Sequence, residues 1–321
     1  MSMTKRSIWP TLGFLLLLLV VPLGFYFYDN AFYLDLATRL VILGIAATSL
    51  NLVLGYGGLI SFGHAAYIGI GAYAVGIPVY HEFYGGFDSI ASTNGLFQIA
   101  IAVGIATLFA LITGAISLRT KGVYFIMITM AFAQMAYYFF LSLDEYGGDD
   151  GLVIEVRSEM PFMDMDSPVQ LFLLCWMSLV VAMLIVRTIV HSRFGMVLQG
   201  AKGNNERMVT LGYNTYVYRL TAYVISGAMC GYAGALMGNF SSFISPAMME
   251  WGRSGELMFM VILGGAATTL GPVLGSAAFI LLEEIFSSVT IYWHLPFGLL
   301  LIGVVLFARG GLTGMFRGRG N

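Results

Sequence analysis

Long apolar runs, separated by short polar or glycine-rich breaks, make up most of the chain. A run of about 20 apolar residues is long enough to cross a bilayer as a helix. Ten spans are predicted, at approximately 8–28, 36–54, 62–81, 96–117, 122–142, 169–190, 216–238, 255–269, 271–289 and 294–308. Eight or nine spans are the alternative, because the run at 255–269 is short and a boundary falls near Gly271-Pro272. The pattern predicts an all-α integral membrane protein with one transmembrane domain over 1–321.

Two glycine-rich breaks interrupt the apolar pattern between spans. The first, over 55–64, reads GYGGLISFGH, and the second, over 264–272, reads GGAATTLGP. Non-helical backbone at membrane depth persists only where protein or water satisfies its polar groups, and broken helices often mark transport pathways. The loose likeness of the two breaks suggests an internal repeat. Two consecutive GxxxG patterns, 227–231 and 234–238, predict close helix packing in lipid.

The composition and the motifs exclude several classes of protein. Of the 321 residues, 59% are hydrophobic and only 10% charged, against about 25% charged in soluble domains. The net charge of −2 gives no basic field for a nucleic-acid partner. Cys175 and Cys230 lie in apolar runs without metal-ligand spacing. The nearest approach to a P-loop, 195–203, has Lys202 one place late and no Ser or Thr after it. We therefore expect no metal, cofactor or catalytic site, and any ATPase must be another chain.

The positions of the basic residues predict the orientation. Cytoplasmic loops of membrane proteins carry an excess of Lys and Arg. With the N-terminus inside, only Arg39, Arg157 and Arg253 of the 15 basic residues lie outside, which leaves 12 inside. The inside residues are Lys5, Arg6, Arg119, Lys121, Arg187, Arg193, Lys202, Arg207, Arg219, Arg309, Arg317 and Arg319. Both termini are then cytoplasmic, and the acidic loop over 143–168 is periplasmic, either as a solvated loop or as a docking surface.

Polar residues inside the spans are candidates for the translocation path. His64 ends the first break with Ser61 nearby and Tyr67 one turn on, and its role is either a helix-terminal hydrogen bond or a contact with the path. Thr129 and Gln134 lie in the span at 122–142. Glu283, next to Glu284, lies in an apolar run near the outer end of its span. Intramembrane carboxylates are functional candidates by default.

The cytoplasmic segment over 192–215 alternates apolar and charged residues, and Gly212 is a natural helix stop. A short amphipathic helix over 196–212 that docks in a groove of an ATPase fits this pattern. Leu198 and Met208 are its candidate apolar anchors, and Lys202, Glu206 and Arg207 are its candidate charges. The alternative is an interfacial helix that lies on lipid.

Several stretches together resemble a known family, the permease subunits of bacterial high-affinity branched-chain amino acid ABC importers, of the M type. They are 50–73, 119–125, 147–152, 192–212, 225–235 and 261–275, in family order. The resemblance implies an inner-membrane permease that pairs with a homologous second permease, two ATPase subunits and a periplasmic solute-binding protein. It leaves the substrate open among branched-chain and other amino acids, amides and urea, and does not distinguish homodimeric from heterodimeric pairing.

Two other functions remain in view. One is a secondary transporter in which Glu283 or Glu284 carries a proton. The other is an intramembrane enzyme based on His64, which lacks a nucleophile, base and metal set.

Overall fold

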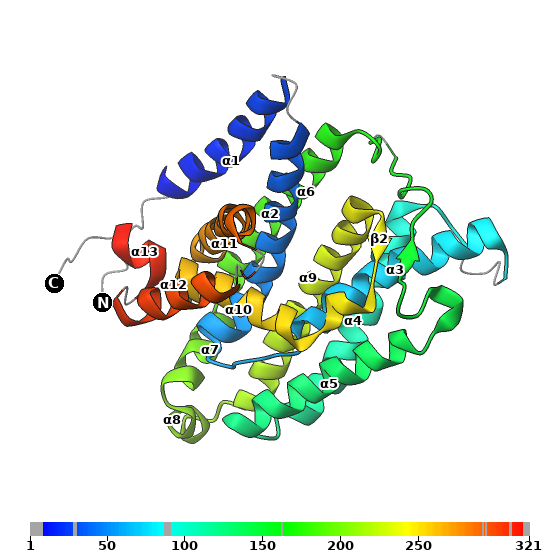
Figure 1. Ribbon diagram of the computed structural model, residues 1–321. Coiled ribbons are helices and arrows are strands. Elements are labelled where there is room, and N and C mark those ends of the chain that lie inside the picture. The colour runs from blue at the N-terminus through cyan, green and yellow to red at the C-terminus, as the bar shows by residue number, and fades with distance from the viewer. Residues whose placement is uncertain are drawn as a thin grey trace.

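The computed structural model describes residues 9–27, 31–86, 91–161, 163–290, 292, 294–307 and 310–316, and these are mostly helical (Figure 1). In chain order the α-helices are α1 (Trp9–Phe27), α2 (Ala31–Asn51), α3 (His64–Tyr84), α4 (Gly95–Ser117), α5 (Val123–Leu141), α6 (Pro168–His191), α7 (Arg193–Gly203), α8 (Asn205–Thr210), α9 (Thr215–Ser241), α10 (Trp251–Gly264), α11 (Gly271–Val289), α12 (His294–Phe307) and α13 (Gly311–Phe316). A π-helical turn, η1 (Leu52–Tyr56), continues α2, and short 3-10 turns are η2 (Asp144–Tyr146) and η3 (Pro246–Met249).

Each predicted span falls on one of these helices, so the prediction of an all-α membrane protein is confirmed. Among the described residues, six helices are long and apolar enough to cross a membrane: α2 with η1, α4, α5, α6, α9 and α11. The others are shorter or more polar, so ten crossings and the internal repeat stay predictions. Of the residues used for the orientation, Lys5, Arg6, Arg309, Arg317 and Arg319 lie outside the described residues.

The glycines of α9 allow close packing against its neighbours. A Cβ on Gly231 would clash with Ala106 of α4, and one on Gly234 would clash with the backbone oxygen of Ile68 in α3. The two GxxxG patterns therefore lie at tight contacts with two different neighbours, as the sequence predicts. α9 packs against α3 and α4, which also contact each other, and against α2 on its other side, so it lies at the centre of the bundle (Figure 1).

The acidic loop over 143–168 is tied to the end of α9. Its strand β1 (Leu152–Val153) pairs antiparallel with β2 (Phe243–Ile244), with Leu152 opposite Ile244. The Ser158 amide also donates to Asn239 Oδ1 of α9 at 2.9 Å. α6 has 24 residues and so spans about 36 Å between this loop and α7. The acidic loop and the segment 192–215 thus lie at opposite ends of the bundle.

Candidate translocation site

The two glycine-rich breaks meet, and one amide side chain at the end of α2 holds them together. Asn51 Nδ2 donates to the Thr268 carbonyl at 2.9 Å, and Asn51 Oδ1 accepts from the Ala267 amide at 2.9 Å. Ala267 has a φ of +59°, a left-handed conformation that is uncommon for a residue with a side chain. Asn51, just before the first break in the chain, thus hydrogen-bonds both an amide and a carbonyl group of the second break.

The first break opens with the π-helical turn η1. Such turns occur frequently at functional sites, because they insert an extra residue into a helix and re-aim its side chains. A Cβ on Gly55, within η1, would lie 2.5 Å from the Ala267 amide nitrogen. The absence of a side chain at Gly55 therefore lets the backbones of the two breaks approach.

His64 starts α3 and is completely buried in a chain of hydrogen bonds. Ser226 of α9 donates to the Ser49 carbonyl at 2.6 Å, so its oxygen accepts from His64 Nε2 at 2.9 Å. The proton then lies on Nε2, and His64 Nδ1 accepts from the Ser61 hydroxyl at 3.1 Å. This chain connects α2, the first break, α3 and α9.

Two further candidates brace the same region. Thr129 Oγ1 of α5 accepts from the Phe62 amide at 3.2 Å. Thr113 of α4 donates to the Phe109 carbonyl at 2.8 Å and so accepts from the Tyr67 hydroxyl at 3.0 Å. The Tyr67 ring meets the His64 ring edge-to-face with centroids 5.5 Å apart.

The structure thus brings Ser61, His64, Tyr67 and Thr129 together, and leaves two path candidates elsewhere. The Gln134 amide nitrogen is buried on α5 and has no hydrogen-bond partner among the described residues. Glu283 lies on α11, where it accepts two hydrogen bonds from Arg39 of α2 at 3.0 and 3.1 Å. Glu284, next to it, is exposed.

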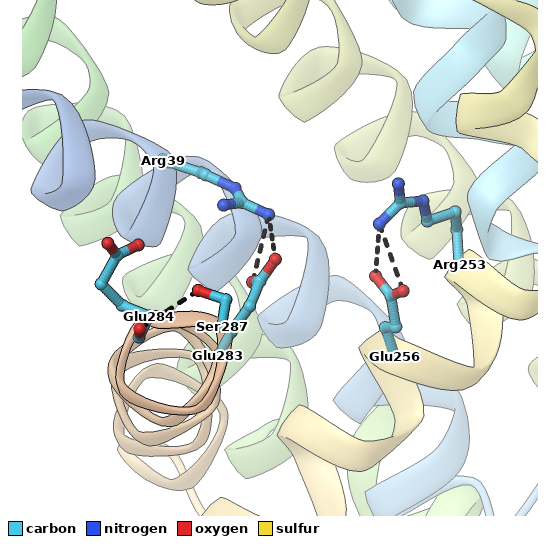
Figure 2. Close-up of polar contacts among 6 residues, drawn as sticks. All are labelled: Arg39, Arg253, Glu256, Glu283, Glu284 and Ser287. Carbon is cyan, nitrogen blue, oxygen red and sulfur yellow. Dashed lines mark hydrogen bonds and ion pairs between the residues drawn. The ribbon is translucent and has the colours of Figure 1, made fainter. Parts of the chain in front are cut away.

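A cavity of about 140 Å³ lies between α2, α3, α9 and α10. Its charged lining residues are Arg39, Arg253 and Glu256, and Arg253 forms an ion pair with Glu256 at 3.0 Å. Figure 2 shows this pair facing the Arg39–Glu283 pair. The rest of the lining is apolar, and consists of Ile42, Leu43, Ala46, Ile68, Ala233, Met237, Met248, Leu257 and Met260.

Arg39 and Arg253 are predicted from the sequence only as charges on the outer side, whereas the structure places both at the cavity. Two signals were present in the sequence. Arg39 lies inside the predicted span 36–54, where a charge is costly unless it is paired. Arg253 and Glu256 are spaced i, i+3 at the start of an apolar helix, a spacing that favours an ion pair.

The segment 192–215 forms two helices, α7 and α8, where one was expected. Asn204 separates them, because its side chain caps α8 by accepting from the Arg207 amide at 2.9 Å. Gly212 has a φ of +88° and follows the end of α8, as expected of a glycine stop.

The side chains of this segment divide between the bundle and the surface. Leu198 is 0% exposed and packs with Leu52 and Tyr56 of η1, so it is not a surface anchor in this structure. Lys202 Nζ donates to the Gly55 carbonyl at 2.6 Å. Met208 is half-buried against Gly200, while Glu206 and Arg207 are exposed.

Apolar helices, broken segments that meet and a cavity with charged residues in its lining are the features of a transport permease of the membrane. The family described as "Branched-chain amino acid transport system / permease component" matches residues 32–309, and the chain belongs to this family. It is an ABC-transporter permease component and not an enzyme, and its homologues and apolar helices indicate a multi-pass inner-membrane protein.

Three curated relatives show how far the similarity extends. The high-affinity branched-chain amino acid transport system permease proteins LivM of Salmonella typhimurium (strain LT2) and Escherichia coli (strain K12) are each 24% identical over 95% of this chain and 75% of their own length. A nucleoside ABC transporter permease protein, NupC of Lactococcus lactis subsp. cremoris (strain MG1363), is 34% identical over 31% of this chain and 36% of its own. No solved structure matches the chain significantly.

Proposed function

We propose that the chain is the translocation subunit of an ATP-driven importer that moves amino acids, foremost branched-chain ones, into the bacterial cytoplasm. It pairs with a homologous permease, two ATPase subunits and a periplasmic binding protein, and needs no cofactor or nucleic acid. The observation that carries the mechanism is the Lys202–Gly55 hydrogen bond. It ties the segment 192–215 to the first break, so that a movement of this segment is transmitted to broken backbone within the bundle.

The hydrogen-bond chain around His64 supports a bracing role in this mechanism. Ser61 and His64 are both completely buried and are absent from the lining of the cavity. A side chain that neither substrate nor water reaches cannot act on a passing solute. We therefore assign Ser61, His64, Tyr67 and Thr129 to holding the break, and the cavity to the substrate.

A proton-coupled secondary transporter is less well supported. Glu283, the candidate proton carrier, already has a cationic partner in Arg39, with both of its carboxylate oxygens within 3.1 Å of the guanidinium. In this structure the Glu283 carboxylate is therefore engaged in an ion pair, and it does not line the cavity.

Transport in proteoliposomes tests the function. The chain is reconstituted with its partner permease, its ATPase subunits and its binding protein, and uptake of radiolabelled L-leucine is followed with ATP on the cytoplasmic side. We expect uptake that requires ATP and survives a protonophore. Uptake that needs no ATP and collapses with the protonophore would establish the secondary transporter instead.

The proposed orientation has its own test. Cytoplasmic termini and a periplasmic acidic loop place Asp150 and Asn204 on opposite sides of the membrane. Asp150→Cys and Asn204→Cys are labelled in intact cells with a membrane-impermeant thiol reagent, against a low background because Cys175 and Cys230 are buried. We expect labelling at 150 only, and labelling of both positions would refute the ten-span arrangement.

A further inference from the structure

The two ion pairs place charges of both signs beside the apolar lining of the cavity. Arg39 with Glu283 comes from α2 and α11, and Arg253 with Glu256 comes from α10 (Figure 2). The two guanidinium groups and two carboxylates of these pairs carry no net charge, although both signs are present, and all but Glu283 line the cavity. Such a pair of ion pairs repels neither end of a molecule that carries one positive and one negative group.

The pairs are accessible enough to exchange partners. The Arg253 side chain is 51% exposed and that of Arg39 is 32% exposed. Ion pairs that remain in contact with water contribute little to stability, so opening one costs little. Arginine also binds a carboxylate through two parallel hydrogen bonds, whether that carboxylate belongs to a glutamate or to a ligand.

The apolar part of the cavity fits an aliphatic side chain. The whole cavity has a volume of about 140 Å³, close to the ~150 Å³ apolar cavity that holds benzene in another protein. A branched four-carbon side chain is smaller than benzene. Ile42, Leu257 and Met260 offer it a surface without hydrogen-bonding groups.

We propose that this cavity is a transient binding site for a zwitterionic aliphatic amino acid on its way through the permease. An arginine exchanges its glutamate for the substrate α-carboxylate, and the released glutamate takes the α-ammonium group. The side chain occupies the apolar cavity. The proposal rests on the proposed function, since it names the site at which the permease receives its substrate.

Protection of an engineered cysteine tests the site directly. Met237 lines the cavity from α9 and is half-buried, so Met237→Cys offers a thiol to a small membrane-permeant reagent in the assembled complex. We expect L-leucine to slow this labelling. Leucinol, which lacks the carboxylate, and 4-methylpentanoate, which lacks the ammonium group, should bind about tenfold more weakly, because each loses one charged partner. Equal protection by the three compounds would refute recognition of a zwitterion.

Variants assign the recognition to the ion pairs. Added to Met237→Cys, Arg253→Gln and Glu256→Gln should each weaken protection by leucine about tenfold. Glu284→Gln, an exposed carboxylate of α11 outside the cavity lining, should leave it unchanged. Arg253→Lys keeps the charge without the planar fork and should protect to an intermediate degree. If the glutamine variants fail to assemble, Arg253→Lys still tests the proposal. Protection by leucine equal to that of the parent Met237→Cys protein would then contradict the role of the guanidinium.

Two outcomes separate this proposal from the proposed function. If Met237→Cys is never labelled in the assembled complex, another subunit fills the cavity and the binding site is refuted, even where ATP-dependent uptake is normal. If leucine protects the cysteine but uptake does not need ATP, the site stands and the proposed energy source is wrong.

Discussion

Lys202 Nζ lies 2.6 Å from the Gly55 carbonyl oxygen, and this hydrogen bond joins α7 to the π-helical turn at the end of α2. The two residues are 147 positions apart in the chain. A Cβ on Gly58 would meet the stem of the Lys202 side chain, so the first break is shaped around it. The contact therefore links the segment proposed to bind the ATPases to the broken backbone within the bundle.

Replacement of Lys202 by methionine should uncouple ATP hydrolysis from uptake. Methionine keeps most of the apolar stem but leaves the Gly55 carbonyl without its charged donor, a loss of about 1–3 kcal/mol. We expect normal assembly and a lower ratio of leucine transported to ATP hydrolysed in proteoliposomes. Lys121→Met, at an exposed lysine between α4 and α5, is the matched control. An unchanged ratio for Lys202→Met would show that the contact does not transmit movement.

Replacement of Asn51 by alanine should destabilise the whole bundle. It leaves the half-buried Ala267 amide and Thr268 carbonyl without their partners, at about 1 kcal/mol for each lost hydrogen bond. The thermal unfolding midpoint of the purified complex in detergent should fall clearly, while Asn214→Ala at the exposed start of α9 should not change it. Equal midpoints for the two variants would mean that the breaks do not depend on Asn51.

Enlargement of Gly231 should separate α9 from α4. Gly231→Leu forces a side chain against Ala106, and overpacking costs about 1–3 kcal/mol or more. The matched control is Gly104→Leu, because a Cβ on Gly104 meets nothing within 4 Å. We expect low yield and early unfolding in detergent for the first variant only. The smaller change Gly231→Ala should be partly rescued by Ala106→Gly, and absence of rescue would place the strain elsewhere.

The sequence predicts the apolar helices and the positions of the two glycine-rich breaks. It does not predict which side chains hydrogen-bond the backbone of those breaks. Apolar run length and glycine clustering are local signals, so the breaks at 55–64 and 264–272 can be identified from the sequence alone. The partners of these breaks are distant: Asn51 and Ala267 are 216 positions apart, and His64 and Ser226 are 162 apart. A single sequence does not show which distant polar groups pair. A hydrogen-bonding role for His64 could therefore be predicted, but not its partner Ser226.

The same limit explains the misplacement of Leu198. In the sequence it is one of several apolar residues interrupted by charges, and an interrupted pattern does not show which side faces the bundle. The structure places Val197 and Leu198 inward and Met196 outward. Further along the segment, Val209 and Leu211 are exposed as well.

Two leucines of the segment 192–215 should therefore have opposite phenotypes. Leu198 is 0% exposed, so Leu198→Ala should cost about 2–5 kcal/mol of stability as a core truncation. Leu211 is 63% exposed, so Leu211→Ala should leave the stability of the permease unchanged and weaken ATPase binding by about 1–2 kcal/mol, as at an interface hot spot. Thermal unfolding of the permease pair without ATPases measures the first effect, and co-purification of the ATPase subunits measures the second.

Glu206 provides the charge control for the same surface. It is exposed on α8 next to Arg207, and charges at the rim of an interface affect orientation and association rate more than core affinity. Glu206→Arg should reach the membrane and unfold at the wild-type temperature, but associate poorly with the ATPases and lose uptake. If Leu211→Ala and Glu206→Arg both keep full ATPase binding and full uptake, the segment does not dock on the ATPases. Its exposed apolar residues, Val209 and Leu211 among them, would then be better explained as a surface that lies on lipid.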